Sequence, residues 1–256
     1  MILCIDVGNS NIFCGVYDAD KIKFRFRYNT KDTGSSDQIG VFLRAVLREN
    51  EISPDMIKQI AVCSVVPNID YSLRAACIKY FGMEPFILKA GVKIKLKINY
   101  RNPLEVGADL IANAIGAIHM FPNQNIIVAD FGTASTLTAI SNQQEYLGTV
   151  IMPGMQTAMH ALHLNTAKLM PVAIVAPDRV IGRSTAEAIQ SGLFYGQLAA
   201  LKEISARIQH EQFSGEEAII VGTGGFSHLF ENEDVFEKIL PDLVLDGLRI
   251  ALSYNT

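Results

Sequence analysis

A short motif occurs twice in this chain, once in each half, and it constrains the fold more than any other feature. Residues 3–5 form an apolar run that leads into Asp6-Val7-Gly8-Asn9-Ser10, and residues 127–129 lead likewise into Asp130-Phe131-Gly132-Thr133-Ala134. Both copies read as a strand that ends in Asp-x-Gly and a small polar residue. Because the copies lie about half the chain apart, the sequence predicts two related half-domains that face one cleft.

The residue types of this motif suit a phosphate group. Glycine lets the backbone approach a ligand closely, and short polar residues beside exposed N–H groups can hold phosphate oxygens. An aspartate at a strand end can bind a cation, directly or through water. Asp-x-Gly-Asn is also an ordinary hairpin turn. Two copies, together with a third glycine turn at Gly222-Thr223-Gly224-Gly225, favour nucleotide binding.

The spacing of apolar residues predicts the remaining elements. The first motif continues as a β-meander with tight polar turns. A capping box, Ser184-Thr185-Ala186-Glu187, predicts the start of a long helix. Residues 93–98 alternate lysine with apolar residues, which is typical of an edge strand protected by charge. The expected strands are 2–7, 11–17, 22–28, 59–66, 93–98, 126–130 and 218–221, and the expected helices are 37–50, 70–81, 109–119, 185–209 and 243–253.

Composition limits the class of protein. The chain has 256 residues, 49% of them apolar, and a net charge of −4, which argues against nucleic acid as the main partner. No apolar run is long enough for a membrane helix, and Asp6 interrupts the apolar stretch at the N-terminus, unlike a signal peptide. The four cysteines have no zinc or CxxC spacing. We expect a cytoplasmic protein with half-domains 1–118 and 119–256 and no membrane or nucleic-acid partner.

Other nucleotide-binding and hydrolytic motifs are missing from the sequence. It contains neither the GxxxxGK[ST] phosphate loop nor the GxGxxG dinucleotide turn. It also lacks the GxSxG nucleophile elbow and the HExxH zinc motif. The repeated Asp-x-Gly corners therefore remain the main candidates for chemistry.

Several strings of residues follow one another in a characteristic order and spacing over nearly the whole chain. The most specific of them is Gly182-Arg183-Ser184-Thr185 with Ala188-Ile189-Gln190-Ser191-Gly192. The others are Asp6-Val7-Gly8-Asn9-Ser10-Asn11, Asn99-Tyr100 with Pro103, Gly107-Ala108-Asp109, Asp130-Phe131-Gly132-Thr133-Ala134, Ile151-Met152-Pro153-Gly154, Thr166-Ala167-Lys168-Leu169 with Pro171, Thr223-Gly224-Gly225 and Pro241-Asp242-Leu243. Taken together, their order and spacing resemble a known family, the type III pantothenate kinases.

The resemblance implies a fold and an activity. The fold is an α/β, duplicated actin-like (ribonuclease H-like) fold, shared by acetate and sugar kinases, heat-shock proteins and actin, with two half-domains around a central cleft. The activity is ATP-dependent phosphorylation of pantothenate to 4′-phosphopantothenate, the first step of coenzyme A synthesis. The resemblance also implies Mg²⁺ with ATP, a monovalent cation (K⁺ or NH₄⁺), and a homodimer with the active site at the subunit interface.

Site residues follow from the same resemblance. Asp109 is the implied general base, at the expected start of a helix. Asp130 is the implied ligand of the monovalent cation, and Asp6 is the candidate for binding magnesium through water. The implied ATP-binding residues are Asp6, Val7, Gly8, Asn9, Ser10, Asn11, Ile12, Phe13 and Thr133, and the implied substrate-binding residues are Tyr100, Gly107, Ala108, Asp109, Leu110 and Thr185, the last reaching the site from the partner subunit.

The chain departs from the family pattern at two places. Leu110 stands where the family usually has an arginine, which removes a positive charge near the anionic substrate. Thr136-Leu137-Thr138 stands where an aspartate often follows the second motif. Two other functions remain open at this point: a sugar or acetate kinase with the same phosphate turns, and a nucleotide-binding accessory protein without turnover.

Overall fold

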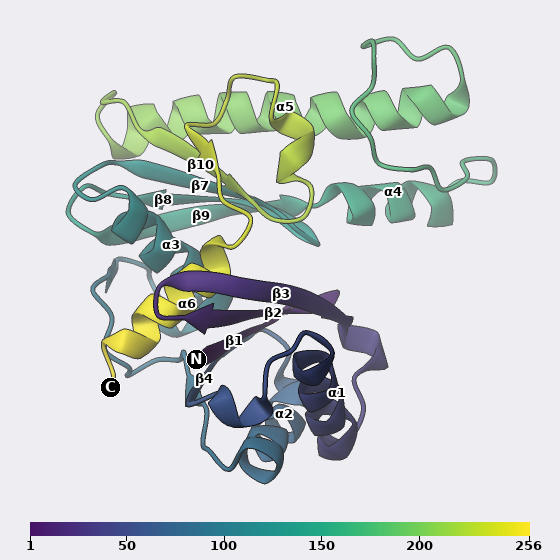
Figure 1. Cartoon of the computed structure of the whole chain (residues 1–256). Coiled ribbons are helices and arrows are strands. Elements are labelled where there is room, and N and C mark those ends of the chain that lie inside the picture. The colour runs from purple at the N-terminus through teal and green to yellow at the C-terminus, as the bar shows by residue number, and fades with distance from the viewer. The chain divides into compact units, whose positions relative to one another are not determined.

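The structure is a computed structural model that describes residues 1–256, and the chain forms two compact units. Unit 1 comprises Met1–Lys95, Arg101–His119 and Leu243–Thr256, and unit 2 comprises Leu96–Tyr100 and Met120–Asp242. Each unit holds one β-sheet with helices packed on it (Figure 1). The C-terminal segment Leu243–Thr256 thus belongs to unit 1. The expected boundary between residues 118 and 119 places this segment in the second half-domain instead. None of the helices combines the length and the apolar character that a membrane span requires.

Unit 1 is built on a five-stranded sheet with the order β3-β2-β1-β4-β5. β1 pairs antiparallel with β2, and β2 with β3, which confirms the predicted meander. β4 pairs parallel with β1, and parallel neighbours need a crossover connection, which here passes through β2, β3 and α1. The strands are β1 (Ile2–Val7), β2 (Asn11–Asp18), β3 (Lys21–Asn29), β4 (Gln59–Ser64) and β5 (Phe86–Ile87), and the helices are α1 (Ser36–Glu49), α2 (Pro67–Phe81), α3 (Ala108–Met120) and α6 (Leu243–Ser253).

Different helices cover the two faces of this sheet. Leu3, Ile5 and Val7 of β1 belong to the core formed with α1 and α2. Successive residues of a strand point to opposite faces, so Cys4 and Asp6 point the other way. On that second face α6 packs on β1 and β4, and α3 contacts α6. The strand therefore directs Asp6 to the face that carries α3 and α6.

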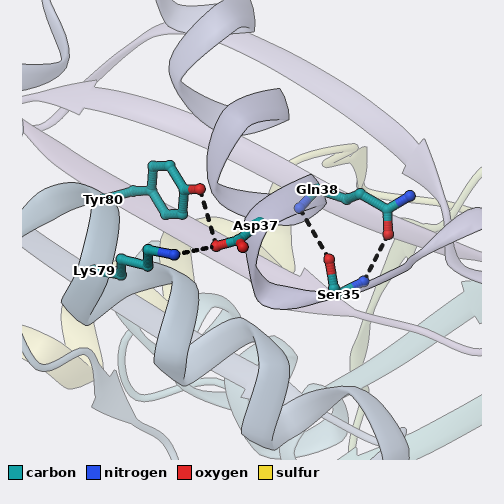
Figure 2. Close-up of polar contacts among 5 residues, drawn as sticks. All are labelled: Ser35, Asp37, Gln38, Lys79 and Tyr80. Atoms are coloured by element: carbon teal, nitrogen blue, oxygen red, sulfur yellow. Dashed lines mark hydrogen bonds and ion pairs between the residues drawn. The ribbon is translucent and has the colours of Figure 1, made fainter.

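Polar side chains fix the start of α1 and tie it to α2 (Figure 2). Ser35 and Gln38 form a capping box, each side chain accepting a hydrogen bond from the backbone N–H of the other. Asp37, in the first turn, accepts hydrogen bonds from Lys79 Nζ at 2.7 Å and from Tyr80 Oη at 2.9 Å. The Lys79 bond, followed by the Tyr80 bond, lowers the pKa of the Asp37 carboxyl. Because the charged partners Asp37 and Lys79 are both exposed, their ion pair mainly sets geometry.

Unit 2 is built on a six-stranded sheet with the order β11-β10-β7-β8-β9-β6. Read from β9 to β11, its strands repeat the arrangement of unit 1, an antiparallel meander followed by two parallel strands. The duplicated motif predicted this duplicated topology, and the structure confirms it. The strands are β6 (Lys97–Ile98), β7 (Ile126–Phe131), β8 (Ala134–Ile140), β9 (Glu145–Pro153), β10 (Ile219–Thr223) and β11 (Lys238–Ile239).

The long helix α5 (Thr185–Gln212) and the shorter α4 (Met155–Leu164) complete unit 2. Apolar residues of α4 and α5 form a core with β7 and β8, and Figure 1 shows α5 running along the sheet. The predicted capping box is half formed: Ser184 accepts from the Glu187 N–H at 3.2 Å, but the Glu187 carboxylate accepts from the Arg183 N–H instead.

The predicted edge strand 93–98 is wrong for most of its length. Only Lys97 and Ile98 pair, with β9 of unit 2. The side chain of Asn255 forms two hydrogen bonds with the backbone of Lys93. It accepts from the Lys93 N–H at 3.0 Å and donates to the Lys93 carbonyl at 2.9 Å. A side-chain amide thus replaces the strand partner that the alternating pattern predicted.

Candidate active site

Asp6 is the penultimate residue of β1 and lies opposite Phe13 on β2 and Cys63 on β4. The thiol of Cys63 donates a hydrogen bond to Oδ1 of Asp6 at 3.3 Å. Cys63 is fully buried, and this burial, followed by the charge of Asp6, raises the pKa of its thiol well above the usual range. The thiol therefore stays protonated and remains a donor to the Asp6 carboxylate.

Asp109 lies in the first turn of α3, as predicted. Its Oδ1 accepts a hydrogen bond from the Leu110 N–H at 2.8 Å. Burial raises the pKa of the Asp109 carboxyl, and the backbone N–H groups lower it by a smaller amount. The charge of Asp109 also acts on the Cys63 thiol, as that of Asp6 does. Unit 1 thus brings two of the three predicted aspartates together around one buried thiol.

The residue before α3 leaves room for this carboxylate. A Cβ atom at Gly107 would overlap Oδ1 of Asp109, so any larger residue would displace the carboxylate. Ala108 and Leu110 flank Asp109 and are half-buried. A carboxylate at a helix N-terminus is favoured by the partial positive charge of the helix, while burial keeps it from full hydration. These opposing effects are typical of a carboxylate that accepts protons.

The first motif forms a tight turn between β1 and β2. The Gly8 N–H donates to the Asn11 carbonyl at 3.1 Å and closes the turn. Asn9, Ser10 and Asn11 are exposed, as a phosphate-binding turn requires. Three other predicted ATP contacts, Val7, Ile12 and Phe13, are strand residues with buried side chains.

The second motif forms the corresponding turn in unit 2, between β7 and β8. The Gly132 N–H donates to the Ala134 carbonyl at 3.0 Å, and the Thr133 carbonyl accepts from Thr157 Oγ1 of α4 at 2.6 Å. A Cβ atom at Gly154 would lie 2.6 Å from the Thr133 carbonyl oxygen. This turn is therefore held against the N-terminus of α4, and glycine is required at residue 154.

Asp130 lies beside the third glycine turn. A Cβ atom at Gly224 would overlap the Asp130 carboxylate and would lie 2.6 Å from the Phe131 backbone nitrogen. Gly224 also has φ +85°, a conformation that favours glycine. Thr223, the residue before it, pairs with Asp130 across the parallel strands β10 and β7. The structure thus brings the second and third predicted turns together in unit 2.

The remaining predicted substrate residues lie elsewhere in unit 2. Tyr100 follows β6 and packs edge-on against Tyr146, with ring centroids 6.2 Å apart. Thr185 is the first residue of α5 and is exposed. Next to it, a cavity of about 440 Å³ is lined by Val175, Ala176, Pro177, Asp178, Arg179, Gly182, Arg183, Glu187 and Gln190. This cavity contains none of the three aspartates.

Sequence reasoning missed Cys63, Thr30 and Gly154. Cys63 lies beside Asp6 because β4 pairs with β1 in this register. A local sequence pattern gives no information on such a pairing. Thr30 donates to the Gly8 carbonyl from just beyond β3, and its position directly after a strand was the one available signal. Gly154 belongs to the family-like string Ile151-Met152-Pro153-Gly154, but the sequence gives no sign of what this glycine packs against.

The carboxylate oxygens of the site suit a hard cation that takes most of its other ligands from a bound phosphate compound. No group of three or more His, Cys, Asp or Glu side chains is placed to hold a metal ion. Mg²⁺ is usually bound through one or two carboxylates together with phosphate oxygens and waters, without a full protein cage. Asp6, half-buried beside an exposed glycine turn, matches that requirement.

Comparison with solved structures identifies the fold. A conserved Campylobacter jejuni protein assigned to the Baf family of transcriptional activators matches with a TM-score of 0.61 at 18% identity, covering 99% of this chain and 98% of that one. A Sinorhizobium meliloti protein described as a 2-dehydro-3-deoxygalactonokinase matches with a TM-score of 0.56 at 13% identity, covering 98% and 96%. The fold is that of actin-like ATPases and sugar kinases, as predicted.

Comparison at the level of sequence identifies the family. The family model described as type III pantothenate kinase matches residues 2–207. A curated type III pantothenate kinase of Legionella pneumophila (strain Paris) is 57% identical over 256 residues, covering 100% of both chains. On these matches, together with the arrangement of its aspartates and glycine turns, the chain belongs to the type III pantothenate kinase family.

Proposed function

We propose that this protein transfers the γ-phosphoryl group of ATP to the primary hydroxyl of pantothenate, which gives 4′-phosphopantothenate and ADP. The observation that carries the proposal is the pair Asp6 and Asp109, which lie around Cys63 beside an exposed glycine turn. Family membership supports the choice of pantothenate as the acceptor.

Asp109 acts as the general base in this proposal. The hydroxyl oxygen of pantothenate attacks the γ-phosphorus, the bond to the β-phosphate oxygen breaks, and the hydroxyl proton passes to the Asp109 carboxylate. Phosphoryl transfer depends mainly on alignment and charge neutralisation. A half-buried carboxylate whose pKa is raised by burial is a better proton acceptor than a fully hydrated one.

The Asp-Gly turns bind the nucleotide in this proposal. Gly8, Asn9, Ser10 and Asn11 offer backbone N–H groups and short polar side chains to the phosphates, and Thr133 offers a further hydroxyl. Asp6 would hold magnesium, which would neutralise charge on the phosphate oxygens. The Cys63 hydrogen bond supports this role because it fixes one oxygen of Asp6.

The acceptor is bound by Tyr100, Gly107, Ala108, Leu110 and Thr185. Leu110 offers no charge to the pantothenate carboxylate, so we propose that other groups satisfy that end of the substrate. Thr185 acts on the partner subunit's substrate in a homodimer. Exposed apolar side chains in the segment before α5, including Met170 at 68% and Ile181 at 78% exposure, support a subunit interface there. A fully active monomer would contradict this part of the proposal. We further propose that the enzyme works in the cytoplasm.

Asp130 is the proposed ligand of a monovalent cation, K⁺ or NH₄⁺. Replacing Asp130 by alanine is expected to raise the half-saturating potassium concentration by about tenfold or more, because a carboxylate ligand contributes at least ~1.4 kcal/mol. The measurement is kcat as a function of KCl concentration at constant ionic strength. Asp55→Ala, at an exposed site in unit 1, is the control and should leave the potassium dependence unchanged. An unaltered dependence in Asp130→Ala would remove this role.

Two other activities are tested by the same assay. The fold is similar to that of a protein described as a sugar kinase. Other hydroxyl compounds should therefore be tested as acceptors beside pantothenate, with ADP release as the readout. The likeness to a protein assigned to transcriptional activators raises a second candidate, nucleotide binding without turnover. Pantothenate-dependent ADP release supports the kinase, release with another acceptor supports the first alternative, and binding of ATP without release supports the second.

A further inference from the structure

We infer that Thr30 is a positioning residue for the first phosphate turn and that its hydroxyl fixes the direction in which the Asn9 N–H meets the nucleotide. The inference rests on the proposed function, because it assigns this turn to the triphosphate. It concerns a residue outside both repeated motifs.

Thr30 contacts both ends of the turn. Its Oγ1 donates a hydrogen bond to the Gly8 carbonyl at 2.7 Å, and its backbone N–H donates to the Ser10 carbonyl at 3.1 Å. The Thr30 residue itself is only 8% exposed. Asn9, between the two contacted carbonyls, is exposed. A buried side chain thus sets the orientation of an exposed backbone segment.

The segment that carries Thr30 is itself held in place. The Asn29 side chain accepts a hydrogen bond from the Lys31 N–H at 3.0 Å and so caps the short 3-10 turn Thr30–Asp32. Tyr28 Oη donates to the Asp32 carbonyl at 2.7 Å. These bonds fix the backbone on both sides of Thr30, so its hydroxyl is presented to Gly8 from a defined position.

The geometry of the peptide group determines where the Asn9 N–H points once Thr30 binds the Gly8 carbonyl. The Gly8 carbonyl and the Asn9 N–H belong to one planar trans peptide group and therefore point in opposite directions. Because Thr30 binds the carbonyl, the Asn9 N–H points away from Thr30. The backbone hydrogen bonds of the turn do not use the Asn9 N–H as a donor. An exposed N–H in a glycine turn is a suitable donor to a phosphate oxygen.

The turn should survive the loss of this hydroxyl, which separates positioning from folding. Two backbone bonds do not involve the hydroxyl: the Gly8 N–H donates to the Asn11 carbonyl, and the Thr30 N–H donates to the Ser10 carbonyl. A valine at residue 30 keeps the shape of threonine but removes the donor. The expected result is a folded protein whose Gly8–Asn9 peptide group can rotate.

The test measures nucleotide binding separately from turnover. Titration calorimetry with magnesium and a non-hydrolysable ATP analogue gives Kd, and steady-state kinetics give KM for ATP and for pantothenate. Thr30→Val is expected to raise Kd and KM for the nucleotide about tenfold, with KM for pantothenate unchanged. Thr30→Ser, which retains the hydroxyl, should bind nearly as tightly as the natural protein.

The matched control is Thr33→Val in the same segment. The Thr33 hydroxyl donates to the Asn29 carbonyl at 3.4 Å and does not contact the turn, so nucleotide affinity should not change. If Thr30→Val fails to fold, Thr30→Ala replaces it in the comparison with Thr30→Ser.

Two results would overturn the inference: unchanged nucleotide affinity in folded Thr30→Val, or equal weakening in Thr30→Ser and Thr30→Val, which would assign the effect to packing. Failure of the proposed function gives a different result. In that case the natural protein shows no pantothenate-dependent ADP release, while the ratio of nucleotide Kd values between the Thr30 variants still decides the role of the hydroxyl.

Discussion

Replacing Asp109 by asparagine is expected to lower kcat by about 10²–10⁴-fold, the usual contribution of a general base. The amide has nearly the shape of the carboxylate but cannot accept the hydroxyl proton. KM for ATP should change little, because the nucleotide is assigned to the turns. The measurement is kcat and both KM values by coupled ADP release. The control is Asp55→Asn, the same change at an exposed site.

The stability of this variant separates catalysis from folding. Burial raises the folded-state pKa of Asp109 above its unfolded value, so the protonated form is the one that the fold favours. Its contribution to stability is present at low pH and is lost as pH rises through the folded-state pKa. At pH 7 the ionised carboxylate therefore costs stability, and Asp109→Asn should have a Tm equal to or above that of the natural protein. Near-normal kcat in this folded variant would refute the assignment.

Replacing Gly247 by alanine is expected to lower the free energy of unfolding by about 3 kcal/mol or more. In unit 1, α3 and α6 cross where Gly116 and Gly247 meet. A Cβ atom at residue 247 would overlap the Ala112 carbonyl oxygen and lie 2.6 Å from the Ala112 carbonyl carbon. Because these are backbone atoms, the whole helix must shift. Thermal unfolding should show a Tm lower by roughly 6–12 °C.

The control for this change is Gly196→Ala in α5. Gly196 is exposed and a Cβ atom there would contact nothing within 4 Å. Alanine has the higher helix propensity, so this variant should gain up to about 1 kcal/mol. Opposite signs for the same substitution would establish that close helix contact governs Gly247. An equal gain in both variants would show that α3 and α6 do not cross as described.

The duplicated fold could be predicted from sequence because its signal is local and repeated. Asp6-Val7-Gly8 and Asp130-Phe131-Gly132 each report a strand end and a turn within a few residues. Asp109 could be placed at a helix start for the same reason, since apolar spacing follows it directly.

The support around these residues could not be predicted, because it depends on contacts between distant segments. Cys63 contacts Asp6 because β4 pairs with β1. Gly224 lies beside Asp130 because β10 pairs with β7, and most of the sequence of unit 2 lies between these two strands. The predicted strand 93–98 was wrong for a related reason. Its alternating pattern was local, but the partner of Lys93 is Asn255, near the other end of the chain.

The central proposal is that the half-buried carboxylate of Asp109 deprotonates an alcohol while the first glycine turn binds ATP. The most direct measurement is ADP release by the purified protein with ATP, magnesium and pantothenate, in the presence and absence of potassium. The predicted result is ADP formed only when pantothenate is present, faster with potassium, together with an equal amount of phosphorylated pantothenate. A folded protein that binds ATP but releases no ADP on addition of pantothenate, with any monovalent cation, would contradict the account.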